Sequence, residues 1–195
     1  MIEPLANPVD IALIGTGNRA RTVYLPLFEA LKPWVRVVAV CDPVKEHADH
    51  AAAKLGVPAF YDVRELVRVR PMEAALVVTP VDGHHALSVF LSSNGVHNLV
   101  ETSMANMLIQ AREMAVVAER HNVVMRIAEN FFRFPFDRIS KRVIETGVIG
   151  PVHRISCFHD HLGYHNNSRW IVYMGAAPTS VQAIEHVMPT PPYVE

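Results

Sequence analysis

The chain has 195 residues, of which 50% are hydrophobic and 19% are charged, as in an ordinary folded globular protein rather than a disordered one. A formal net charge of −1 gives no reason to expect nucleic acid or an anionic membrane as a partner. The cysteines, Cys41 and Cys157, are far apart and form no C-x-x-C pair, which favours a reduced protein. No secretory leader is recognisable, and no apolar run reaches the roughly 18 residues of a membrane span. We expect a soluble, cytoplasmic protein.

The first 130 residues alternate short apolar runs with stretches suited to helices. Buried strands are predicted at 10–15, 35–40, 73–80, 97–101 and 123–130. Helices are predicted at 21–32, 44–56, 63–70, 84–95 and 108–122. Pro26 predicts a kink or a late start in the first helix, and Gly56 and Gly95 predict helix ends. Buried strands that alternate with helices indicate a parallel sheet covered on both faces.

The pattern changes after residue 130. A helix is predicted over 136–150, ended by Gly147, and a half-buried strand over 152–161. Residues 164–195 are rich in Asn, Pro and His and show no convincing periodicity. A sheet begun with one strand leaves unpaired edges and an uncovered face. We therefore expect a fragment of a longer protein, with a truncated product or a natural short form as alternatives.

A dinucleotide-binding pattern follows the first predicted strand. The sequence there reads G-x-G-x-x-A between a strand and a helix. The first glycine allows a tight turn, the second lets backbone N–H groups reach a diphosphate, and the small third residue allows close packing. The helix N-terminus adds further N–H donors. The candidate cofactor-binding residues of this turn are Gly15, Thr16, Gly17, Asn18, Arg19 and Ala20.

An acidic residue ends the second predicted strand. Asp42 lies 22 positions after Ala20, where a carboxylate is expected to accept hydrogen bonds from the adenosine ribose. Its charge repels a 2′-phosphate, which favours NAD over NADP, although Arg19 could favour a phosphate. The alternative is a turn residue before Pro43. The predicted fold is an α/β, Rossmann-type, doubly wound parallel sheet over 1–129, followed by the start of an α+β second domain over 130–195.

With these residues, the chain resembles the glucose–fructose oxidoreductase / inositol dehydrogenase / MocA (Gfo/Idh/MocA) family. The stretch VVTPVDGHH is similar to the family's T-P-x-x-x-H turn, and GVHNLVETSMA to its G-x-x-V-x-x-E-K-P-x-A segment. ENFFRFP and IETGVIGPV resemble the segments that lead into the family's second domain. The further cofactor-binding residues that this resemblance implies are Thr79, Pro80, His84, Glu101 and Asn130. Glu101 could position the nicotinamide ribose or only end a strand.

The chain departs from the family where a lysine is expected. Thr102 stands in place of that lysine and Ser103 in place of the following proline. Lysine near a cationic nicotinamide can handle the substrate's proton, whereas a threonine hydroxyl is only a relay. Histidine can do the same work near neutral pH. We therefore predict Tyr164 and His165, in a loop after the last strand, as the proton-transfer pair, with Thr102 as a third catalytic candidate and a surface loop as the alternative.

Three further groups of residues have two interpretations each. Arg133 could contact a polar substrate or pair with an acid, and Trp170 could stack on a sugar or anchor a core. His159 and His161 share one face of the predicted strand and could bind a metal, but a polar edge is the commoner outcome. We predict no metal site.

The resemblance implies an NAD-dependent oxidoreductase that acts on a sugar, polyol or related small hydroxyl compound. It also implies a homo-oligomer formed through the second domain, if that domain is complete. One alternative is an NAD-dependent glycosidase. Related α-N-acetylgalactosaminidases also lack the lysine, and their Gly-x-Tyr-x-His-like segment is loosely similar to GYHNNSRW. A non-catalytic NAD-binding or regulatory protein is the third possibility.

Overall fold

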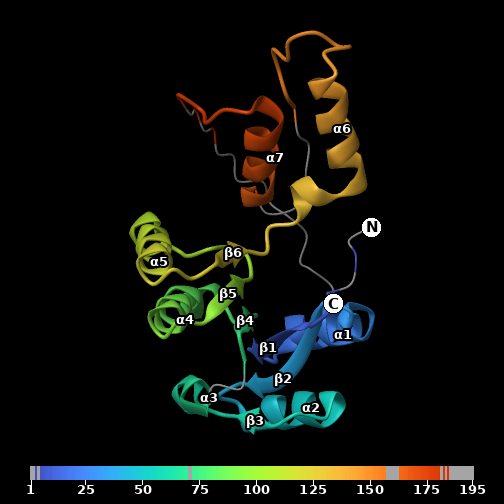
Figure 1. Ribbon diagram of the computed structural model, residues 1–195. Helices are drawn as coiled ribbons and strands as arrows, with labels where there is room; N and C mark the ends of the chain where they lie inside the picture. The colour runs from blue at the N-terminus through green and yellow to red at the C-terminus, as the bar shows by residue number, and fades with distance from the viewer. Residues whose placement is uncertain are drawn as a thin grey trace, which may run out of the picture. The chain divides into compact units, whose positions relative to one another are not determined.

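The computed structural model of the chain describes residues 3, 5–69, 72–156, 163–180, 182 and 184. The chain divides into two compact units, Met1–Glu129 and Asn130–Glu195, which are described separately (Figure 1). Within the described residues, no helix is both long and apolar enough to cross a membrane.

The first unit contains a parallel sheet with the strand order β3-β2-β1-β4-β5-β6. The strands described are β1 Val9–Ile14, β2 Val35–Cys41, β3 Ala59–Phe60, β4 Ala74–Val77, β5 His97–Val100 and β6 Met125–Ile127. The chain moves outward from β1 to β3 and then returns to place β4 on the other side of β1. The predicted doubly wound Rossmann-type sheet is confirmed, and its topological switch point lies between β1 and β4.

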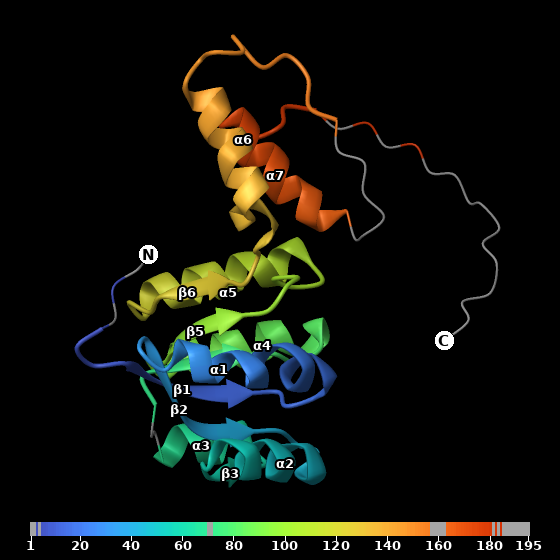
Figure 2. The same cartoon turned by 90° about the vertical axis from the view of Figure 1, so that its right-hand side faces the viewer.

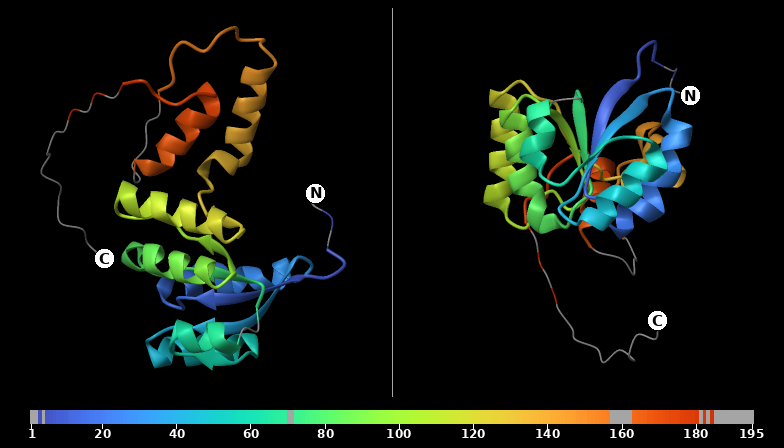
Figure 3. Two further views of the ribbon diagram at one scale, coloured as in Figure 1. Left: turned by 60° about the vertical axis from the view of Figure 1, so that its left-hand side comes forward. Right: turned by 90° about the horizontal axis from the view of Figure 1, so that it is seen from below.

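Helices cover both faces of this sheet (Figures 2 and 3). They are the π-helix η1 Ala20–Tyr24, α1 Leu25–Leu31, α2 Lys45–Leu55, α3 Val63–Val69, α4 Val81–Ser93 and α5 Leu108–Arg120. One apolar cluster joins the sheet to α1 and α2, and the other joins it to α3, α4 and α5. Along β1, Ile11 and Leu13 enter the first cluster, and Ala12 and Ile14 enter the second. Burial on both faces explains why the strands read as continuous apolar runs.

In the first unit the element ends lie within about three residues of the sequence prediction, and β4 and β6 each end three residues earlier than predicted. Pro26 lies in the first turn of α1, but the chain is already helical from Ala20, so the late start holds only for the α-helical part. Gly56 and Gly95 adopt the left-handed conformation that ends a helix. The two-residue strand β3 was not predicted, because it is too short to show a periodicity. Helix α4 begins three residues earlier than predicted, directly after Pro80.

The described part of the second unit is helical. It contains the 3₁₀-helix η2 Phe131–Arg133, α6 Pro135–Glu145 and α7 Tyr164–Met174. The predicted strand at 152–161 is wrong for residues 152–156, which form no strand, and its remainder lies outside the described residues. Helix α7 was not predicted, because its buried positions are the polar residues His165, Asn166 and Arg169. An apolar periodicity therefore could not reveal it.

Candidate functional site

The candidate cofactor site lies where the loops after β1, β2, β4 and β5 meet. All six strands are parallel, so these loops leave the same edge of the sheet. Ligands of open α/β sheets bind at this carboxyl edge, at the switch point of the strand order. The predicted residues of the first unit, from Gly15 to Glu101, therefore lie where a ligand is expected.

The two glycines of the turn after β1 have different reasons to be glycine. Gly15 has a φ of +86°, and a Cβ there would come within 2.6 Å of the Val78 carbonyl oxygen. The protein itself therefore requires glycine at this position. Gly17 has no left-handed φ, and a Cβ there would meet no atom within 4 Å. Nothing in the described chain demands glycine at 17, and open space lies beside its backbone, which fits the close approach of a diphosphate.

Asp42 connects the end of β2 to this turn. Its Oδ2 accepts hydrogen bonds from the backbone N–H of Thr16 at 2.7 Å and from the Thr16 hydroxyl at 3.1 Å. Its Oδ1 accepts the N–H of Val44 at 2.9 Å, as expected of a turn residue. A carboxylate oxygen has two acceptor positions, so a ribose hydroxyl can still donate to the same group. The ribose contact stays a prediction.

The helix that follows the turn begins in an unusual form. Ala20 is fully buried and starts the π-helix η1, a conformation found frequently at functional sites. The carbonyl oxygen of Asn18 accepts a hydrogen bond from the Thr22 hydroxyl at 2.9 Å, which stabilises the start of the helix. Backbone N–H groups at this helix start can bind an anion.

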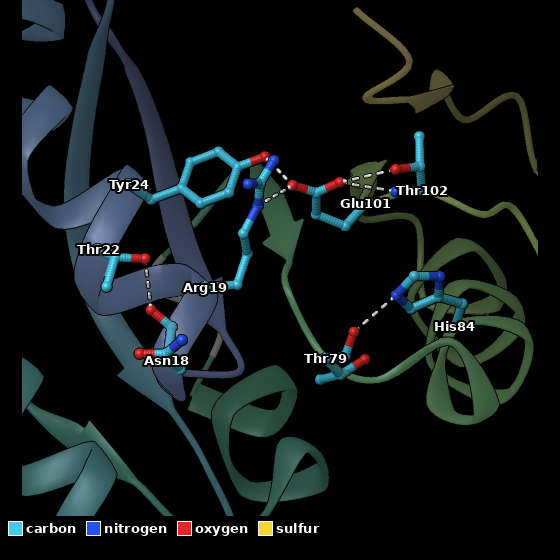
Figure 4. Close-up of polar contacts among 8 residues, drawn as sticks. All are labelled: Asn18, Arg19, Thr22, Tyr24, Thr79, His84, Glu101 and Thr102. Atoms are coloured by element: carbon cyan, nitrogen blue, oxygen red, sulfur yellow. Dashed lines mark hydrogen bonds and ion pairs between the residues drawn. The ribbon is translucent and has the colours of Figure 1, made fainter. Parts of the chain in front are cut away.

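Glu101, directly after β5, is the centre of a polar cluster (Figure 4). Its Oε1 accepts hydrogen bonds from Arg19 Nε at 2.9 Å and from the Tyr24 hydroxyl at 2.8 Å. Its Oε2 accepts the backbone N–H of Thr102 at 2.7 Å and the Thr102 hydroxyl at 3.3 Å. Burial raises the pKa of Glu101, but the donors from Thr102, Arg19 and Tyr24 outweigh burial, so its pKa lies below the ordinary value. A carboxylate with these partners is a weak base, and it holds the side chains of Arg19, Tyr24 and Thr102 together.

Thr102 occupies the place of the family's lysine, and its hydroxyl donates to the Glu101 carboxylate. The peptide bond between Thr102 and Ser103 is cis. The pKa of Tyr24 is raised by burial and by its hydrogen bond to Glu101, so this hydroxyl keeps its proton at neutral pH. The cluster therefore contains no strong base for a substrate proton.

His84, a residue of α4, contacts two loops of the site. It is fully buried in α4, with Nε2 2.9 Å from the carbonyl oxygen of Thr79 and Nδ1 2.7 Å from that of Ser103. The ring therefore links the loop after β4 to the loop after β5; Figure 4 shows its contact with Thr79. A buried ring in this position can influence a cofactor through these loops.

Thr79 lies between two glycines. Its Cγ2 is 2.9 Å from the position of a Cβ on Gly15, and its Oγ1 is 3.2 Å from that of a Cβ on Gly83. Among the described residues, this buried Oγ1 has no hydrogen-bond partner. Pro80, the next residue, is exposed and precedes the first turn of α4. The loop after β4 is therefore packed closely against the glycine-rich turn.

The predicted proton-transfer pair lies in the second unit, in a helix rather than in the predicted loop. Tyr164 and His165 begin α7. His165 is buried, and its ring stacks on the Phe131 ring with the centroids 3.9 Å apart. The centroid of the Tyr164 ring lies 4.1 Å from that of His165. The loop location is therefore wrong, and the catalytic role of the pair stays a prediction.

The remaining predicted residues also belong to the second unit. Asn130 is exposed and precedes η2, and the Arg133 guanidinium lies over the Phe132 ring at 4.9 Å. Trp170 is 44% exposed on α7, so it is not a core anchor. His159 and His161 lie outside the described residues. Contacts of Asn130, Arg133 and Trp170 with a ligand stay predictions.

The sequence analysis missed Tyr24. Its partner, Glu101, is 77 residues away along the chain, and no local pattern predicts the π-helix that places the tyrosine. The only available signal was an aromatic residue shortly after the glycine-rich turn.

Comparisons with known proteins identify the family and the fold of the chain. Residues 9–129 match the family model GFO_IDH_MocA, described as an oxidoreductase family with an NAD-binding Rossmann fold. A glycosyl hydrolase family 109 protein of Streptomyces niveus is 34% identical over 122 residues, 57% of this chain and 24% of that protein. A D-apiose dehydrogenase of Paraburkholderia graminis is 26% identical over 140 residues, 71% of this chain and 37% of that protein.

Solved structures show the same fold. An oxidoreductase of Thermotoga maritima superposes with a TM-score of 0.76 at 22% identity, over 87% of this chain and 60% of that one. An oxidoreductase of Agrobacterium radiobacter, solved with NAD⁺, L-tartaric acid and magnesium, also gives 0.76, at 19% identity over 87% and 55% of the two chains. The chain spans between 24% and 45% of the length of the curated relatives it matches. This chain belongs to the Gfo/Idh/MocA family of oxidoreductases, which is characterised by an NAD-binding Rossmann fold.

Proposed function

We propose that the first unit binds NAD across the carboxyl edge of its sheet and that the chain is part of an NAD-dependent oxidoreductase. The substrate class proposed is a sugar, a polyol or another small hydroxyl compound. The observation that carries the proposal is the open space beside the Gly17 backbone at the switch point, with Asp42 at the end of the neighbouring strand. A diphosphate fits the first feature, and an adenosine ribose fits the second.

The residues divide between the two halves of the dinucleotide. The turn after β1 and the start of η1 would bind the diphosphate, and Asp42 would accept the adenosine ribose hydroxyls. The loops around Thr79, Pro80 and Glu101, on the other side of the switch point, would hold the nicotinamide riboside. The Arg19 Nε is bonded to Glu101, and this pairing, together with the charge of Asp42, supports NAD over NADP. Bound NAD would supply a hydride acceptor.

Oxidation of a hydroxyl also needs a group that takes its proton. Glu101 is a weak base and Tyr24 holds its proton, so the first unit offers no replacement for the lysine among its described site residues. We keep Tyr164 and His165 as the proposed proton-transfer pair, with Arg133 and Trp170 as proposed substrate contacts. Thr102 is proposed as a relay only, because its hydroxyl donates to Glu101.

Calorimetric titration tests the cofactor, and a panel of polyols tests the reaction. We expect heat with NAD, weaker or no heat with NADP, and a loss of NAD affinity in Asp42→Asn. Growth of NADH absorbance with a sugar or polyol would support the dehydrogenase. Absence of heat with either nucleotide would refute the proposal. Equal NAD affinity in Asp42→Asn and in the unaltered protein would also contradict it.

A second candidate function is an NAD-dependent glycosidase. The relatives from Streptomyces named as glycosyl hydrolase family 109 proteins support it, as does the threonine at 102. Such an enzyme would pass a hydride from the sugar to NAD, eliminate the aglycone as its alcohol, add water to the resulting double bond and return the hydride to the sugar. Release of an aryl leaving group without net NADH would favour it over the dehydrogenase. Cofactor binding with neither reaction would instead favour a non-catalytic NAD-binding protein.

We further propose that the protein works in the cytoplasm and that it forms a homo-oligomer through its second unit. The resemblance to the family supports the oligomer, and the widely separated cysteines, Cys41 and Cys157, support a reducing compartment. Light scattering coupled to gel filtration would measure the assembly, and a monomer at micromolar concentration would contradict it.

A further inference from the structure

The Tyr24 hydroxyl joins helix η1, which follows β1, to Glu101, which follows β5. Tyr24 ends η1, which follows the glycine-rich turn after β1, and its hydroxyl donates to Glu101 at 2.8 Å. Glu101 follows β5, and β4 lies between β1 and β5 in the sheet. The hydrogen bond therefore spans the carboxyl edge of β4, in the half of the site opposite Asp42.

Both oxygens of the Glu101 carboxylate are engaged. Tyr24 and Arg19 donate to Oε1, and the backbone and hydroxyl of Thr102 donate to Oε2. Only 8% of the Glu101 side chain is exposed, whereas 57% of the Arg19 side chain is. Tyr24 is half-buried and Arg19 is exposed, so Tyr24 is the more enclosed of the two donors that reach Glu101 from η1 and the turn before it. A buried bond to an ionised acceptor is stronger than one between neutral groups.

We propose that Tyr24 is a positioning residue of the cofactor site and acts through Glu101. It holds the loop after β5 at a fixed separation from the glycine-rich turn, and so shapes the part of the crevice that receives the nicotinamide riboside. The same contact fixes Thr102, because the backbone and hydroxyl of Thr102 bond to the same carboxylate. This inference rests on the proposed binding of NAD. The adenosine half would lie on the Asp42 side, whereas the hydrogen bond of Tyr24 reaches Glu101 on the other side of the switch point.

Replacement of Tyr24 by phenylalanine removes the hydroxyl and keeps the ring. The matched control is Tyr61→Phe, because the Tyr61 hydroxyl donates to the Asp49 carboxylate at 2.7 Å on the exposed surface of the same unit. Each variant is titrated calorimetrically with NAD and with ADP, which lacks the nicotinamide riboside. We expect Tyr24→Phe to weaken NAD binding about three- to tenfold, the range of one hydrogen bond, and to leave ADP binding unchanged. Tyr61→Phe should change neither.

A double variant tests whether Tyr24 acts through its proposed partner. In Tyr24→Phe combined with Glu101→Gln, the loss of NAD affinity should be smaller than the product of the two single losses, because both changes disrupt one contact. Equal NAD affinity in Tyr24→Phe and Tyr61→Phe would overturn the inference, as would equal losses for NAD and ADP. Failure of the unaltered protein to bind NAD would instead overturn the proposed function.

Discussion

Each unit of the protein contains a carboxylate that accepts hydrogen bonds from an arginine and a tyrosine. In the first unit, Glu101 accepts them from Arg19 and Tyr24. In the second unit, Asp137 on α6 accepts them from Arg169 and Tyr173 on α7. The side chains of Asp137 and Arg169 are only 1% and 9% exposed, whereas that of Arg19 is 57% exposed.

The difference in exposure suggests different roles for similar chemistry. The Asp137 cluster is enclosed between two helices, and the Arg169 guanidinium lies over the rings of Phe131 and Phe136 at 5.0 and 5.3 Å. The bidentate pair between Asp137 and Arg169 joins α6 to α7. The Glu101 cluster lies at the carboxyl edge of a sheet that already has an apolar core on each face. We therefore expect the Glu101 cluster to affect ligand binding and the Asp137 cluster to affect the stability of the fold.

The largest effect is expected from Asp137→Ala. The change leaves the Arg169 guanidinium buried without its bidentate partner, which costs about 3 to 5 kcal/mol of unfolding free energy. Denaturant unfolding followed by circular dichroism would measure the loss. Asp62→Ala is the matched control, because Asp62 forms a bidentate pair with Arg64 on the surface. Equal losses in the two variants would contradict a structural role for Asp137.

A smaller stability effect and a clear binding effect are expected from Glu101→Gln. The amide cannot form the ion pair with Arg19, so NAD affinity should fall roughly tenfold, as for the loss of a charged hydrogen bond. Calorimetry on this variant and on Asp137→Asn would compare the two clusters directly. An unchanged NAD affinity in Glu101→Gln would remove Glu101 from the proposed site.

The Glu101 contribution to stability should depend on pH. Its pKa in the folded protein lies below the ordinary value of 4.5, so the unfolded state binds the proton more readily. The stabilisation is therefore present above pH 4.5 and is lost as the pH falls below that value through the folded-state pKa. The free energies of unfolding of the unaltered protein and of Glu101→Gln should differ at pH 6 and become equal in acid. A difference in unfolding free energy that does not change with pH would contradict an ionised Glu101 carboxylate in the folded protein.

The smallest effect is expected from Tyr173→Phe. Burial and the hydrogen bond to Asp137 raise the pKa of Tyr173 to about 12, so its hydroxyl remains a donor over the neutral range. Arg169 still binds Asp137 in this variant, so the loss should be only about 1 kcal/mol. Thermal unfolding would show a small decrease relative to Tyr61→Phe. A loss as large as that of Asp137→Ala would indicate that the tyrosine is the main partner.

The comparison of the units also explains what the sequence could reveal. In the first unit, residues such as Leu13 and Ile14 are buried on opposite faces of the sheet, so apolar runs indicate the strands directly. In α7 the buried positions are polar and Ile171 and Met174 are exposed, so the helix gives no such signal. The glycine-rich turn and Asp42 were predictable because a known motif spacing links the turn after the first strand to the end of the second strand. The contact between Tyr24 and Glu101 was not, because only the folded sheet brings the two together.

The central claim is that a dinucleotide crosses the switch point beside the backbone of Gly17. Gly17→Ala tests it most directly, because a Cβ there meets no protein atom within 4 Å and should leave folding unaffected. Gly163→Ala is the control, since its Cβ would also meet nothing within 4 Å and it lies in the second unit. Calorimetry should show NAD affinity reduced about tenfold by Gly17→Ala, through overpacking against the diphosphate, and unchanged by Gly163→Ala. Equal NAD affinity in both variants, with equal melting temperatures, would contradict the account.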